Sequence, residues 1–559
     1  MHPDEIIRKI LEIRGIVTEE DVREFLSVKP QLTHDPMLMP GMEEGTEFLL
    51  RVLKDGKRVC VYGDYDVDGV CGTSLLVLFL RELAGFLKSG SVITYYIPSR
   101  IEEGYGLNQS AIQFIKDTGA DVIVTVDCGS VSTAEAAFAR EIGLEILITD
   151  HHDPDPDRLP DCILVNPKIV SEKGGYPFEK LAGAGVAFKL CAALLARMEE
   201  EDTEAMHGVR SCLNSLLDFV GTATIADVMP LTDENRTFVK YGGALLWKGT
   251  RQSFNVLLAF CGIEPAKLKV RDVAFGISPR LNALGRLGDA SEAVEFFLTE
   301  DEDRRRAIAE HMERLNSERR KIQEDCYREC MDLVEAGSAE GFLLLKPVNS
   351  HEGVAGIVAG KVRDATGLPC AVLTKTQDDN ELLKGSVRSA GRLDVISLLR
   401  KHSELFVRFG GHAAAAGFTI DHKNEDILLE ALSSDIAEML RREPDLFRDS
   451  EEAELEIGVT DVTIQLAEAL DRLAPFGVGN PKPALALRVP ADRITGVRTM
   501  GHEGKHLRFT ADGIQCVFFG GSVTRFPDTG TALIIGCPEV NEWNGQRNIQ
   551  FAVSHIDVL

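Results

Sequence analysis

The residues best suited to chemistry in this chain are acids and histidines that follow short apolar runs. The stretch Arg58–Gly72 reads RVCVYGDYDVDGVCG, in which an apolar run ends in three aspartates spaced two apart, Asp64, Asp66 and Asp68. Carboxylates crowded at the end of a buried strand repel one another strongly, because their surroundings have a low dielectric constant. The pattern therefore predicts a positive charge that holds these side chains together.

Further acids and imidazoles occupy similar places along the chain. DVIVTV precedes Asp127, LEILIT precedes Asp150, His151 and His152, and the helical stretch FVGTATIADVMPL supplies Asp227. Each residue alone could be a helix cap or part of a hydrogen-bonded turn. Independent caps have no reason to gather at one edge of a sheet, so we expect a shared site.

Oxygen-rich ligation with one or two imidazoles suits Mn²⁺ or Mg²⁺ better than zinc. The acids suffice for two ions that share a bridging ligand. Paired ions about 3.5–4 Å apart can activate a water and stabilise the leaving oxygen in phosphoester hydrolysis. The predicted positive charge is therefore a divalent metal pair.

A parallel α/β sheet must position these groups. Between about residues 57 and 167, apolar strand-like runs such as KRVCVYGD and DVIVTVDCG alternate with helical stretches such as NQSAIQFIKDTG. Near-continuous apolar strands separated by helices predict a parallel sheet covered on both faces, and its carboxyl-terminal edge is where ligands bind. The sequence from 183 to 300 is predominantly helical.

The rest of the chain divides into a charged helix, a second α/β region and a strand-rich end. The boundaries we predict are an N-terminal helical segment 1–50, a catalytic domain 51–300, a connecting helix 301–337, an α/β domain 338–445 and a β-barrel domain 446–559. Short alternating strands with Gly and Pro turns indicate the barrel.

The bulk composition is that of a soluble globular protein of several domains. The 559 residues are 44% hydrophobic and 27% charged, with a net charge of −27, so a nucleic-acid groove would have to be local and salt-sensitive.

The apolar run GTSLLVLFL is interrupted by Arg81 and Glu82, and we expect no membrane association. Twelve cysteines without paired spacing predict reduced thiols and a cytoplasmic location.

Several motifs resemble a known superfamily. YGDYDVDG, VDCG, TDHHDP and GTATIADVMPL are similar to the four successive motifs of the DHH phosphoesterases, and GSVRS and RFGGHAAAAGF to their associated DHHA1 domain. ISPRLNALGRLGDA, LAPFGVGNPKP and the C-terminal strands narrow the resemblance to the RecJ family of single-stranded-DNA exonucleases. The resemblance implies a parallel-sheet DHH domain, a long connecting helix, a smaller α/β DHHA1 domain and a C-terminal OB-fold β-barrel.

The resemblance also implies an activity. It is that of a metal-dependent exonuclease that hydrolyses single-stranded DNA in the 5′→3′ direction to 5′-mononucleotides, in DNA repair and recombination. An enzyme acting on RNA or short oligonucleotides is one alternative, and a non-catalytic replication scaffold is another. Single-strand-binding protein and helicases are the protein partners that the family leads us to expect.

Roles in the metal site carry over by motif. The resemblance implies that Asp127 bridges the ions, and that His152 supports the ligands or transfers a proton. The remaining implied ligands are Asp66, Asp68, His151 and Asp227, with Asp64 beside them. Family members usually have Asn where this chain has Cys128, whose thiol either tunes the metal preference or is a packed spectator.

Phosphate-binding groups are expected in the second α/β region. Consecutive N–H groups at Gly410 and Gly411 in a glycine-rich turn, with His412, could cradle a phosphate, although tight backbone packing would use the same glycines. Arg388 beside Ser386 offers a bidentate fork. The resemblance implies that Ser386, Arg388 and also Arg100, which follows a core strand, bind the 5′-terminal phosphate.

Other groups could contact the strand. Arg280, Asn282 and Arg286 in SPRLNALGR could line its path or cap a helix, and His351 lies between two departures from the family pattern, Ser350 and Glu352. In the barrel, stacking aromatics over a positive groove would bind single strands. The candidates are Phe509, Phe518, Phe519, Trp543, Lys505, Arg508 and Arg547, and alternation must bury several of the aromatics.

Overall fold

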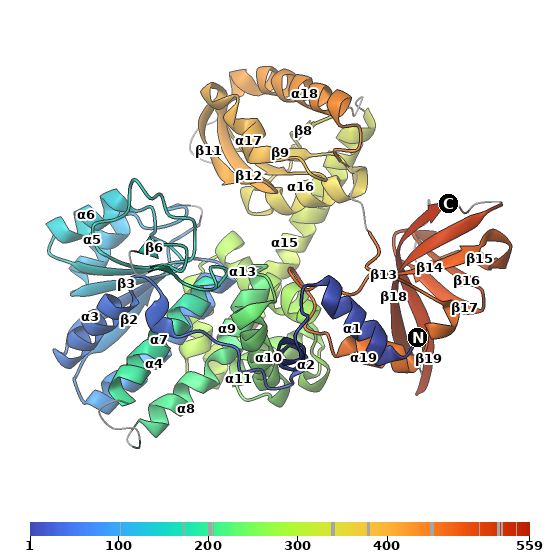
Figure 1. Ribbon diagram of the computed structural model, residues 1–559. Coiled ribbons are helices and arrows are strands. Elements are labelled where there is room, and N and C mark those ends of the chain that lie inside the picture. The colour runs from blue at the N-terminus through green and yellow to red at the C-terminus, as the bar shows by residue number, and fades with distance from the viewer. Residues whose placement is uncertain are drawn as a thin grey trace. The chain divides into compact units, whose positions relative to one another are not determined.

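The computed structural model describes residues 1–100, 102–171, 174–199, 204, 206–336, 341–376, 381–447, 452–501, 504–521, 526, 529–543 and 545–558 (Figure 1). The chain forms two compact units. The first contains Met1–Leu281, Ala290–Arg306 and Glu451–Leu559, and the second contains Asn282–Asp289 and Ala307–Ser450. The first unit contains a parallel sheet and a C-terminal sheet with separate cores, and the second unit contains a mixed sheet.

The first unit contains the predicted parallel sheet. Its strands are β1 (Arg58–Gly63), β2 (Val92–Tyr96), β3 (Val122–Val126), β4 (Glu145–Thr149) and β5 (Ile163–Val165). They lie in the order β2-β1-β3-β4-β5, and every neighbouring pair is parallel. The β-branched runs predicted from the sequence are these strands, and β3 is buried along its whole length.

Helices cover both faces of this sheet, as predicted. One face is covered by α5 (Gln109–Asp117) and α6 (Thr133–Glu141), and the other by α3 (Met42–Lys54), α4 (Val67–Leu87) and α7 (Gly183–Glu199) (Figure 1). Side chains of Cys60 and Tyr62 on β1 and Ile123 on β3 share a core cluster with Ile112 on α5. A two-stranded ribbon, β6 (Val170–Ser171) and β7 (Gly174–Gly175), follows β5.

Among the described helices, α4 is the one that is long and apolar enough to cross a membrane, judged by length and composition alone. The interruption by Arg81 and Glu82 noted in the sequence therefore does not keep α4 below this limit. However, 67% of its most apolar stretch is buried inside the protein. Packing against β1, α7 and α9 (Leu217–Ala226) accounts for this burial, which is typical of a core helix.

The remaining helices of the chain's middle part follow in sequence. They are α8 (His207–Ser215), α10 (Asp233–Lys248), α11 (Gln252–Cys261), α12 (Val270–Asp272), α13 (Ser278–Leu287), α14 (Ser291–Leu298) and the long α15 (Glu302–Ala336). A π-helical turn, Val273–Ile277, leads into α13. The predicted long connecting helix is α15, most of whose charged residues are exposed.

The second unit contains a mixed sheet. Its strands are β8 (Leu343–Leu345), β9 (Cys370–Lys375), β10 (Leu382–Arg388), β11 (Phe406–His412) and β12 (Ala415–Asp421), in the order β11-β12-β10-β9-β8. Helix α16 (Glu352–Thr366) packs with α15 on one face. The other face packs against α17 (Val395–Arg400) and α18 (Glu425–Arg442).

The C-terminal strands belong to the first unit. They are β13 (Leu455–Ile457), β14 (Leu485–Pro490), β15 (Ile494–Met500), β16 (His506–Ala511), β17 (Ile514–Phe518), β18 (Thr531–Trp543) and β19 (Gln546–Val558), with α19 (Ile464–Asp471) between the first two. They form one sheet in the order β13-β14-β18-β19-β17-β16-β15.

The N-terminal helices join the C-terminal core. Helix α1 (Pro3–Ile13) contributes Ile6, Ile7, Ile10 and Leu11 to the same buried cluster as the C-terminal strands, and Phe25 of α2 (Glu19–Leu26) packs against it. An amphipathic helix must bury its apolar stripe somewhere. The sequence pattern does not indicate that the two ends of the chain share one core.

Candidate metal centre

The strand ends bring the predicted acids together at one edge of the parallel sheet. Strands β1, β3 and β4 are neighbours, and Asp64, Asp127 and Asp150 directly follow them. The crossover direction reverses between β1 and β3, which makes this the switch point where open α/β sheets bind ligands. The convergence expected from the sequence is therefore present in the fold.

Asp66 caps helix α4 with one carboxylate oxygen and leaves the other oxygen for a cation. It is the N-cap of α4, and its Oδ1 accepts hydrogen bonds from the N–H groups of Asp68 (2.8 Å) and Gly69 (3.1 Å). A Cβ at Gly69 would lie 2.4 Å from the Asp64 carbonyl oxygen, so only glycine allows α4 to begin this close to the strand end. The cap fixes Asp66 while Oδ2 remains available to a cation.

The amino-terminal end of α7 holds Asp68. The N–H groups of Gly183 and Ala184 donate to its two carboxylate oxygens at 2.6 and 2.7 Å. This carboxylate also benefits from the positive end of the helix dipole. A Cβ at Gly183 would lie 2.6 Å from the Cβ of Asp127, so the glycine lets α7 approach both acids.

Asp127 is buried in a strained backbone conformation. Its φ is +65°, in the left-handed region that Asp tolerates better than most residues, and its N–H donates to the Thr149 carbonyl at 3.1 Å. Strain of this kind is typical of functional sites. The neighbouring Cys128 is fully buried in the apolar cluster beneath the sheet, so the structure favours its reading as a packed spectator.

His151 points one ring nitrogen into the acid cluster. Its Nδ1 donates to the Leu181 carbonyl at 2.8 Å, which leaves a lone pair on Nε2. That nitrogen lies 3.0 Å from Oδ1 of Asp127, 3.6 Å from Oδ2 of Asp227 and 3.8 Å from Oδ2 of Asp68. The ring is buried and oriented as a metal-binding imidazole is.

Four buried polar atoms of this site lack hydrogen-bond partners within the described part of the chain. Asp64 Oδ1, Asp127 Oδ1, His151 Nε2 and Asp227 Oδ2 are buried, and no described residue forms a hydrogen bond with them. Leaving such atoms unpaired costs free energy, so a bound cation is the natural partner. The donor set, five carboxylates and an imidazole, fits Mn²⁺ or Mg²⁺.

Three overlapping groups of atoms are close enough to hold an ion. They are Asp64–Asp66–Asp127, Asp68–His151–Asp227 and Asp127–His151–His152, with all ligand atoms of a group within 4.8 Å of one another. Asp127 and His151 each belong to two of these groups, and of the two the carboxylate of Asp127 has a second oxygen with which it could bridge two ions. The residues predicted as ligands therefore lie together.

Burial and charge repulsion, with no cation bound, raise the pKa values of several of these acids. Burial, with the charge of Asp66, raises the pKa of Asp68 to about 7, and burial, with the charges of Asp68 and Asp66, raises the pKa of Asp227 to about 8. Burial and the surrounding acids also raise the pKa of Asp127 well above its ordinary value. A divalent cation would reverse these shifts.

His152 lies in a network that sequence analysis only partly predicts. Its Nδ1 lies 2.8 Å from Oδ1 of Asp150 and 3.0 Å from the Tyr105 hydroxyl. Burial would lower the pKa of His152, but the hydrogen bond and charge of Asp150 raise it to about 9. Burial would raise the pKa of Asp150, yet its bonds to His152 and the Ser130 N–H hold that pKa well below its ordinary value.

Tyr105 is a functional candidate missing from the residues predicted for the site, and Asp150, which is expected at this edge, has no predicted role. Asp150 accepts N–H bonds from both His151 and His152 and so orients the two imidazoles. Tyr105 also lies 3.3 Å from the Asp127 carbonyl. Tyr105 follows β2, so its position in a loop at the same sheet edge was the available signal.

Arg100 lies near the first acids of the motif, and its contact with a terminal phosphate stays a prediction. It follows β2, and its guanidinium carbon is 5.0 Å from the centre of the Tyr65 ring, between the first two acids of the motif. Its charge also opposes the burial that raises the pKa of Asp64. Arg100 is therefore a cation that the structure places beside this edge of the sheet.

In the second unit, Ser386 and Arg388 lie side by side over a glycine of α16. A Cβ at Gly356 would lie 2.8 Å from the Ser386 hydroxyl oxygen and 2.9 Å from Nη2 of Arg388. Burial, with the nearby charge of Arg363, lowers the pKa of Arg388. A partly buried guanidinium next to a hydroxyl and a second arginine is suited to an anion.

The prediction that Gly410, Gly411 and His412 form a turn is wrong, while their contact with a phosphate stays a prediction. Gly410, Gly411 and His412 lie in the edge strand β11, and the turn follows at residues 413 and 414. Strand β12 separates them from β10, with Gly410 opposite Gly417 and Gly417 opposite Ser386. The glycines therefore keep the sheet face beside Ser386 free of side chains, which is the physical reason for their presence.

His351 and Arg286 hold the beginning of α16. The Nδ1 of His351 accepts the Gly353 N–H at 3.0 Å as an N-cap, and Nη1 of Arg286 donates to the Gly353 carbonyl at 2.6 Å. Glu352, a departure from the family pattern, pairs with Lys384 on β10 at 2.5 Å. These contacts give both predicted substrate residues a structural role, and Ser350 precedes the cap.

Arg280 does not line a surface path. Its side chain is buried, and its guanidinium donates to the carbonyls of Gly276 at 2.8 Å and Phe260 at 3.2 Å. It thereby supports the π-helical turn before α13. Asn282 is half-buried on α13, and its contact with a strand stays a prediction.

Among the barrel aromatics, one is well placed to stack a base. Phe509 is fully buried in the core, Phe518 is half-buried, and Phe519 is 61% exposed with its ring 5.2 Å from that of His506. Arg508 bonds Gln515 and Arg547 pairs with Glu468, while Lys505 is exposed. The side chain of Trp543 lies outside the described residues.

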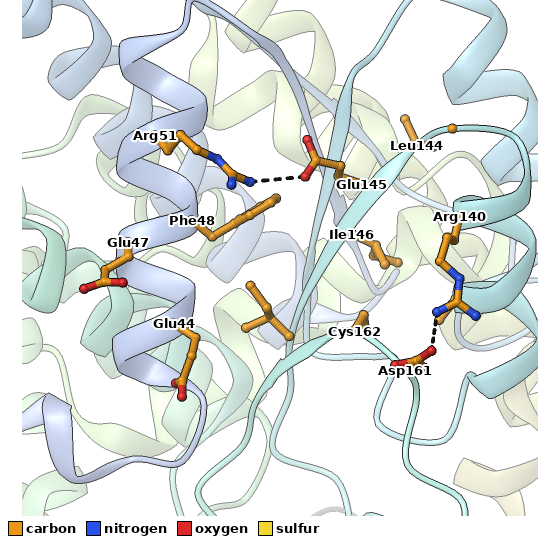
Figure 2. Close-up of a pocket in the computed structure, with 13 residues that line it drawn as sticks. Glu44, Glu47, Phe48, Arg51, Arg140, Leu144, Glu145, Ile146, Asp161 and Cys162 are labelled. Carbon is orange, nitrogen blue, oxygen red and sulfur yellow. Dashed lines mark hydrogen bonds and ion pairs between the residues drawn. The ribbon is translucent and has the colours of Figure 1, made fainter.

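A large pocket lies away from this chemistry. It has a volume of about 740 Å³ and is lined from α3, α6 and the beginnings of β4 and β5, at the opposite end of the strands from Asp150. Figure 2 shows Arg51 paired with Glu145 and Arg140 paired with Asp161 across it. It contains none of the predicted site residues.

Three family models match the chain. Residues 58–222 match the DHH family, N-terminal domain, residues 340–438 match the DHHA1 domain, and residues 453–555 match the RecJ OB domain. RecJ from Bacillus subtilis, a single-stranded-DNA-specific exonuclease, is 34% identical over 99% of this chain and 68% of its own length.

Solved structures agree with the family models. The crystal structure of RecJ from Thermus thermophilus in complex with Mn²⁺ superimposes with a TM-score of 0.80, at 29% identity, over 98% of this chain and 75% of that chain. The structure of the same RecJ with Mg²⁺ gives a TM-score of 0.74 at 27% identity over 98% and 74%.

The parallel sheet, its acid-lined switch point and the DHHA1 unit define the DHH class of phosphoesterases. Within that class, full-length identity and the C-terminal domain are more specific. The chain belongs to the RecJ family of single-stranded-DNA-specific exonucleases. The resemblance and the fold class predicted from the sequence are thereby confirmed.

Proposed function

We propose that this protein degrades single-stranded DNA from the 5′ end to 5′-mononucleotides, as part of DNA repair and recombination. The observation that carries the proposal is the buried cluster around Asp127 and His151, whose inward-facing atoms have no partner in the described chain. Crystal structures of family members in complex with Mn²⁺ or Mg²⁺ support a divalent cation there. The matched RecJ OB domain supports a single-stranded substrate.

Asp64, Asp66, Asp68, Asp127, His151 and Asp227 would hold two divalent ions, with Asp127 shared between them. Bound there, the ions supply water activation and neutralise charge on the leaving oxygen. The protein's own contribution is to fix the ligands. Asp66 is held as a helix cap, Asp68 by the α7 amides and His151 by the Leu181 carbonyl.

His152 is the residue placed to handle a proton. Asp150 and Tyr105 hold Nδ1, so Nε2 is the ring nitrogen left to exchange a proton with the reacting groups. The side chain is 47% exposed, unlike that of His151, so substrate can reach it. We infer from these contacts that His152 transfers a proton, which is one of the two roles that the sequence leaves open for it.

The polarity of cleavage would follow from the phosphate contacts. Ser386 and Arg388 of the second unit would bind the 5′-terminal phosphate. Arg100, which the resemblance implies for the same role, lies beside the acids of the first unit. A bidentate arginine contact favours a terminal phosphate over a hydroxyl. Single-strand-binding protein, helicases and a cytoplasmic location complete the proposal.

One experiment tests the proposal directly. Purified protein is incubated with Mn²⁺ and end-labelled DNA or RNA single strands, with 5′-phosphate or 5′-hydroxyl ends, with and without EDTA. Mononucleotides released from the 5′ end of DNA, and abolished by EDTA, are the expected result. Faster turnover of RNA or of very short strands would favour the oligonucleotide alternative, and inertness with every substrate would favour a scaffold.

A further inference from the structure

We propose that the loop Leu473–Asn480, which lies within the RecJ OB region, positions the metal-binding Asp227 through Arg236. This inference rests on the proposed function, because it assigns Asp227 to the metal site. The loop lies in the LAPFGVGNPKP motif, to which neither the metal site nor the phosphate contacts give a role. The loop contacts the segment after Asp227 through a backbone hydrogen bond and through close packing of two glycines.

The backbone next to Asp227 needs support. Helix α9 ends at Ala226, Asp227 is its C-cap, and Val228 follows with φ +57°. A β-branched residue is strained in this left-handed conformation, where glycine is the usual choice. Val228 is also 65% exposed, so its own side chain gains little from packing. The N–H groups of Val228 and Met229 donate to the Ile225 and Thr224 carbonyls at the end of α9, and the contacts described next add to this local support.

The loop contacts Pro230 and Leu231, which lie two and three residues after Val228. The N–H of Leu231 donates to the Val478 carbonyl at 2.7 Å. A Cβ at Gly477 would lie 2.8 Å from Cδ1 of Leu231, and one at Gly479 would lie 3.0 Å from Cβ of Pro230. The two glycines thus let the loop pack against Pro230 and Leu231 without intervening side chains.

Arg236 ties the same loop to α10. Its guanidinium donates to the carbonyls of Leu473 at 3.1 Å and Ala474 at 2.8 Å, and it stacks on the Phe25 ring at 3.7 Å. The loop is itself rigid, because the buried Asn480 amide donates to the carbonyls of Leu473 and Pro475. Arg236 and the loop together form a clamp around residues 228–236.

The clamp has a consequence for metal binding. Asp227 lies three residues before Pro230, so a loosened clamp would release the strained turn and let the carboxylate leave the cluster around His151. Groups that orient metal ligands from outside typically change metal affinity by about 10- to 100-fold. We therefore assign Arg236 and the loop as positioning residues for the metal site.

The test measures Mn²⁺ binding by titration calorimetry on the full-length protein without DNA, at a temperature well below unfolding. Arg236→Met removes the bonds to the loop carbonyls, and Gly477→Val wedges the loop away from Leu231. Each is expected to weaken Mn²⁺ binding by at least about tenfold. Arg236→Lys, which keeps a donor for the carbonyls, is expected to restore most of the affinity.

A matched control separates positioning from stability. Phe551→Leu disturbs the buried cluster that also contains Leu473, but it removes none of the hydrogen bonds that join the loop to Leu231 and Arg236. It is expected to lower the melting temperature while Mn²⁺ affinity stays within twofold of wild type. If Arg236→Met and Gly477→Val also stay within twofold, the inference is overturned and the proposed function stands. If Phe551→Leu weakens binding as much as they do, the effect is general destabilisation and the inference is likewise overturned. A wild-type protein that neither binds Mn²⁺ nor cleaves DNA would overturn both proposals.

Discussion

The Nε2 atom of His151 lies 3.0 Å from Oδ1 of Asp127, and neither atom has a hydrogen-bond partner among the described residues. The proton of His151 resides on Nδ1, which bonds the Leu181 carbonyl. Burial and the charge of His152 lower the pKa of His151 to about 4, so the ring is neutral near pH 7. Two electron-rich atoms this close are stable when a cation binds both of them.

Asp127→Asn is expected to abolish cleavage and to stabilise the metal-free protein. The amide keeps the shape of the side chain but removes the shared charge, so activity in Mn²⁺ should fall by about 10³-fold or more. In EDTA the same change removes buried repulsion, so the melting temperature should rise above that of wild type. Turnover assays and thermal melts with and without Mn²⁺ check both effects.

The control for this variant is Asp161→Asn. Asp161 pairs with Arg140 at the opposite end of the strands, so its loss should leave activity and the Mn²⁺ response unchanged. Binding of single-stranded DNA in EDTA should survive in both variants. Asp127→Asn with near-normal turnover would contradict the assignment of the bridging ligand.

The stabilisation by Mn²⁺ is expected to grow as pH rises from about 5 to 8. Asp68 and Asp227 have pKa values of about 7 and 8 in the metal-free fold, against an ordinary value near 4. A carboxyl group with a raised pKa binds its proton more tightly when folded, so its stabilising effect is lost as pH rises through the folded value. Metal binding requires these carboxyl groups to be deprotonated. The stabilisation by Mn²⁺ therefore increases over the same pH range in which the metal-free protein loses stability.

Thermal melts at saturating Mn²⁺ and in EDTA, at half-unit steps of pH, measure this effect. The difference in melting temperature should be small at pH 5 and reach about 5 °C or more at pH 8. Ca²⁺ at the same concentration serves as an ionic-strength control. A difference that stays constant over this range would show that the acids titrate independently of the metal.

The sequence predicts the location of the metal site because the physics of strand ends is local. The strands β1, β3 and β4 can be located from apolar runs whose length and pattern are typical of parallel strands. Because the strands are parallel, the residues that follow them, Asp64, Asp127 and His151, lie at one edge of the sheet. No contact between distant segments has to be known for this step. The fold class follows from the same alternation of strands and helices.

The support of the site could not be predicted, because it depends on tertiary contacts. The grip of the Gly183 and Ala184 amides on Asp68 spans more than 100 residues, and the bond from Tyr105 to His152 depends on how a loop folds back. The turn predicted at Gly410 failed for a different reason. Glycine marks turns and also strands that need an empty face, and the sequence does not separate the two.

Arg388→Gln is expected to remove the preference for 5′-phosphorylated ends. A hydrogen bond to a charged group contributes about 1.5–3 kcal/mol, so the ratio of kcat/KM for phosphate over hydroxyl ends should fall by about 10- to 100-fold. The rate on hydroxyl-ended strands should change little. Single-turnover assays on matched strands with either end measure the ratio.

Arg392→Gln provides the matched control for this prediction. Arg392 lies four residues further on in the same unit, but it is exposed and pairs with Glu443, so the end preference should persist. Equal losses on both kinds of end in Arg388→Gln would indicate that this arginine supports the fold of β10. The anion-binding assignment of Ser386 and Arg388 would then be wrong.

Phe519→Ala is expected to weaken binding of long single strands without destabilising the protein. Phe519 is exposed beside His506 in the strand-rich domain, whereas Phe509 fills the core, so of these two rings Phe519 offers a face to a base. Stacking on an aromatic side chain contributes about 1–3 kcal/mol per base, which predicts a loss of about 5- to 100-fold in affinity. Fluorescence anisotropy with labelled oligonucleotides in EDTA measures it.

The length of the substrate makes this prediction specific. A strand too short to reach the domain gains nothing from Phe519, so its cleavage rate should match that of wild type, while long strands are degraded more slowly at low concentration. Val497→Ala removes another exposed apolar side chain from the same sheet and should leave both substrates unaffected. Because stacking is insensitive to base identity, the loss should be similar for different sequences. A loss that appears equally with short and long strands would place the effect in the catalytic domain and exclude Phe519 as a stacking platform.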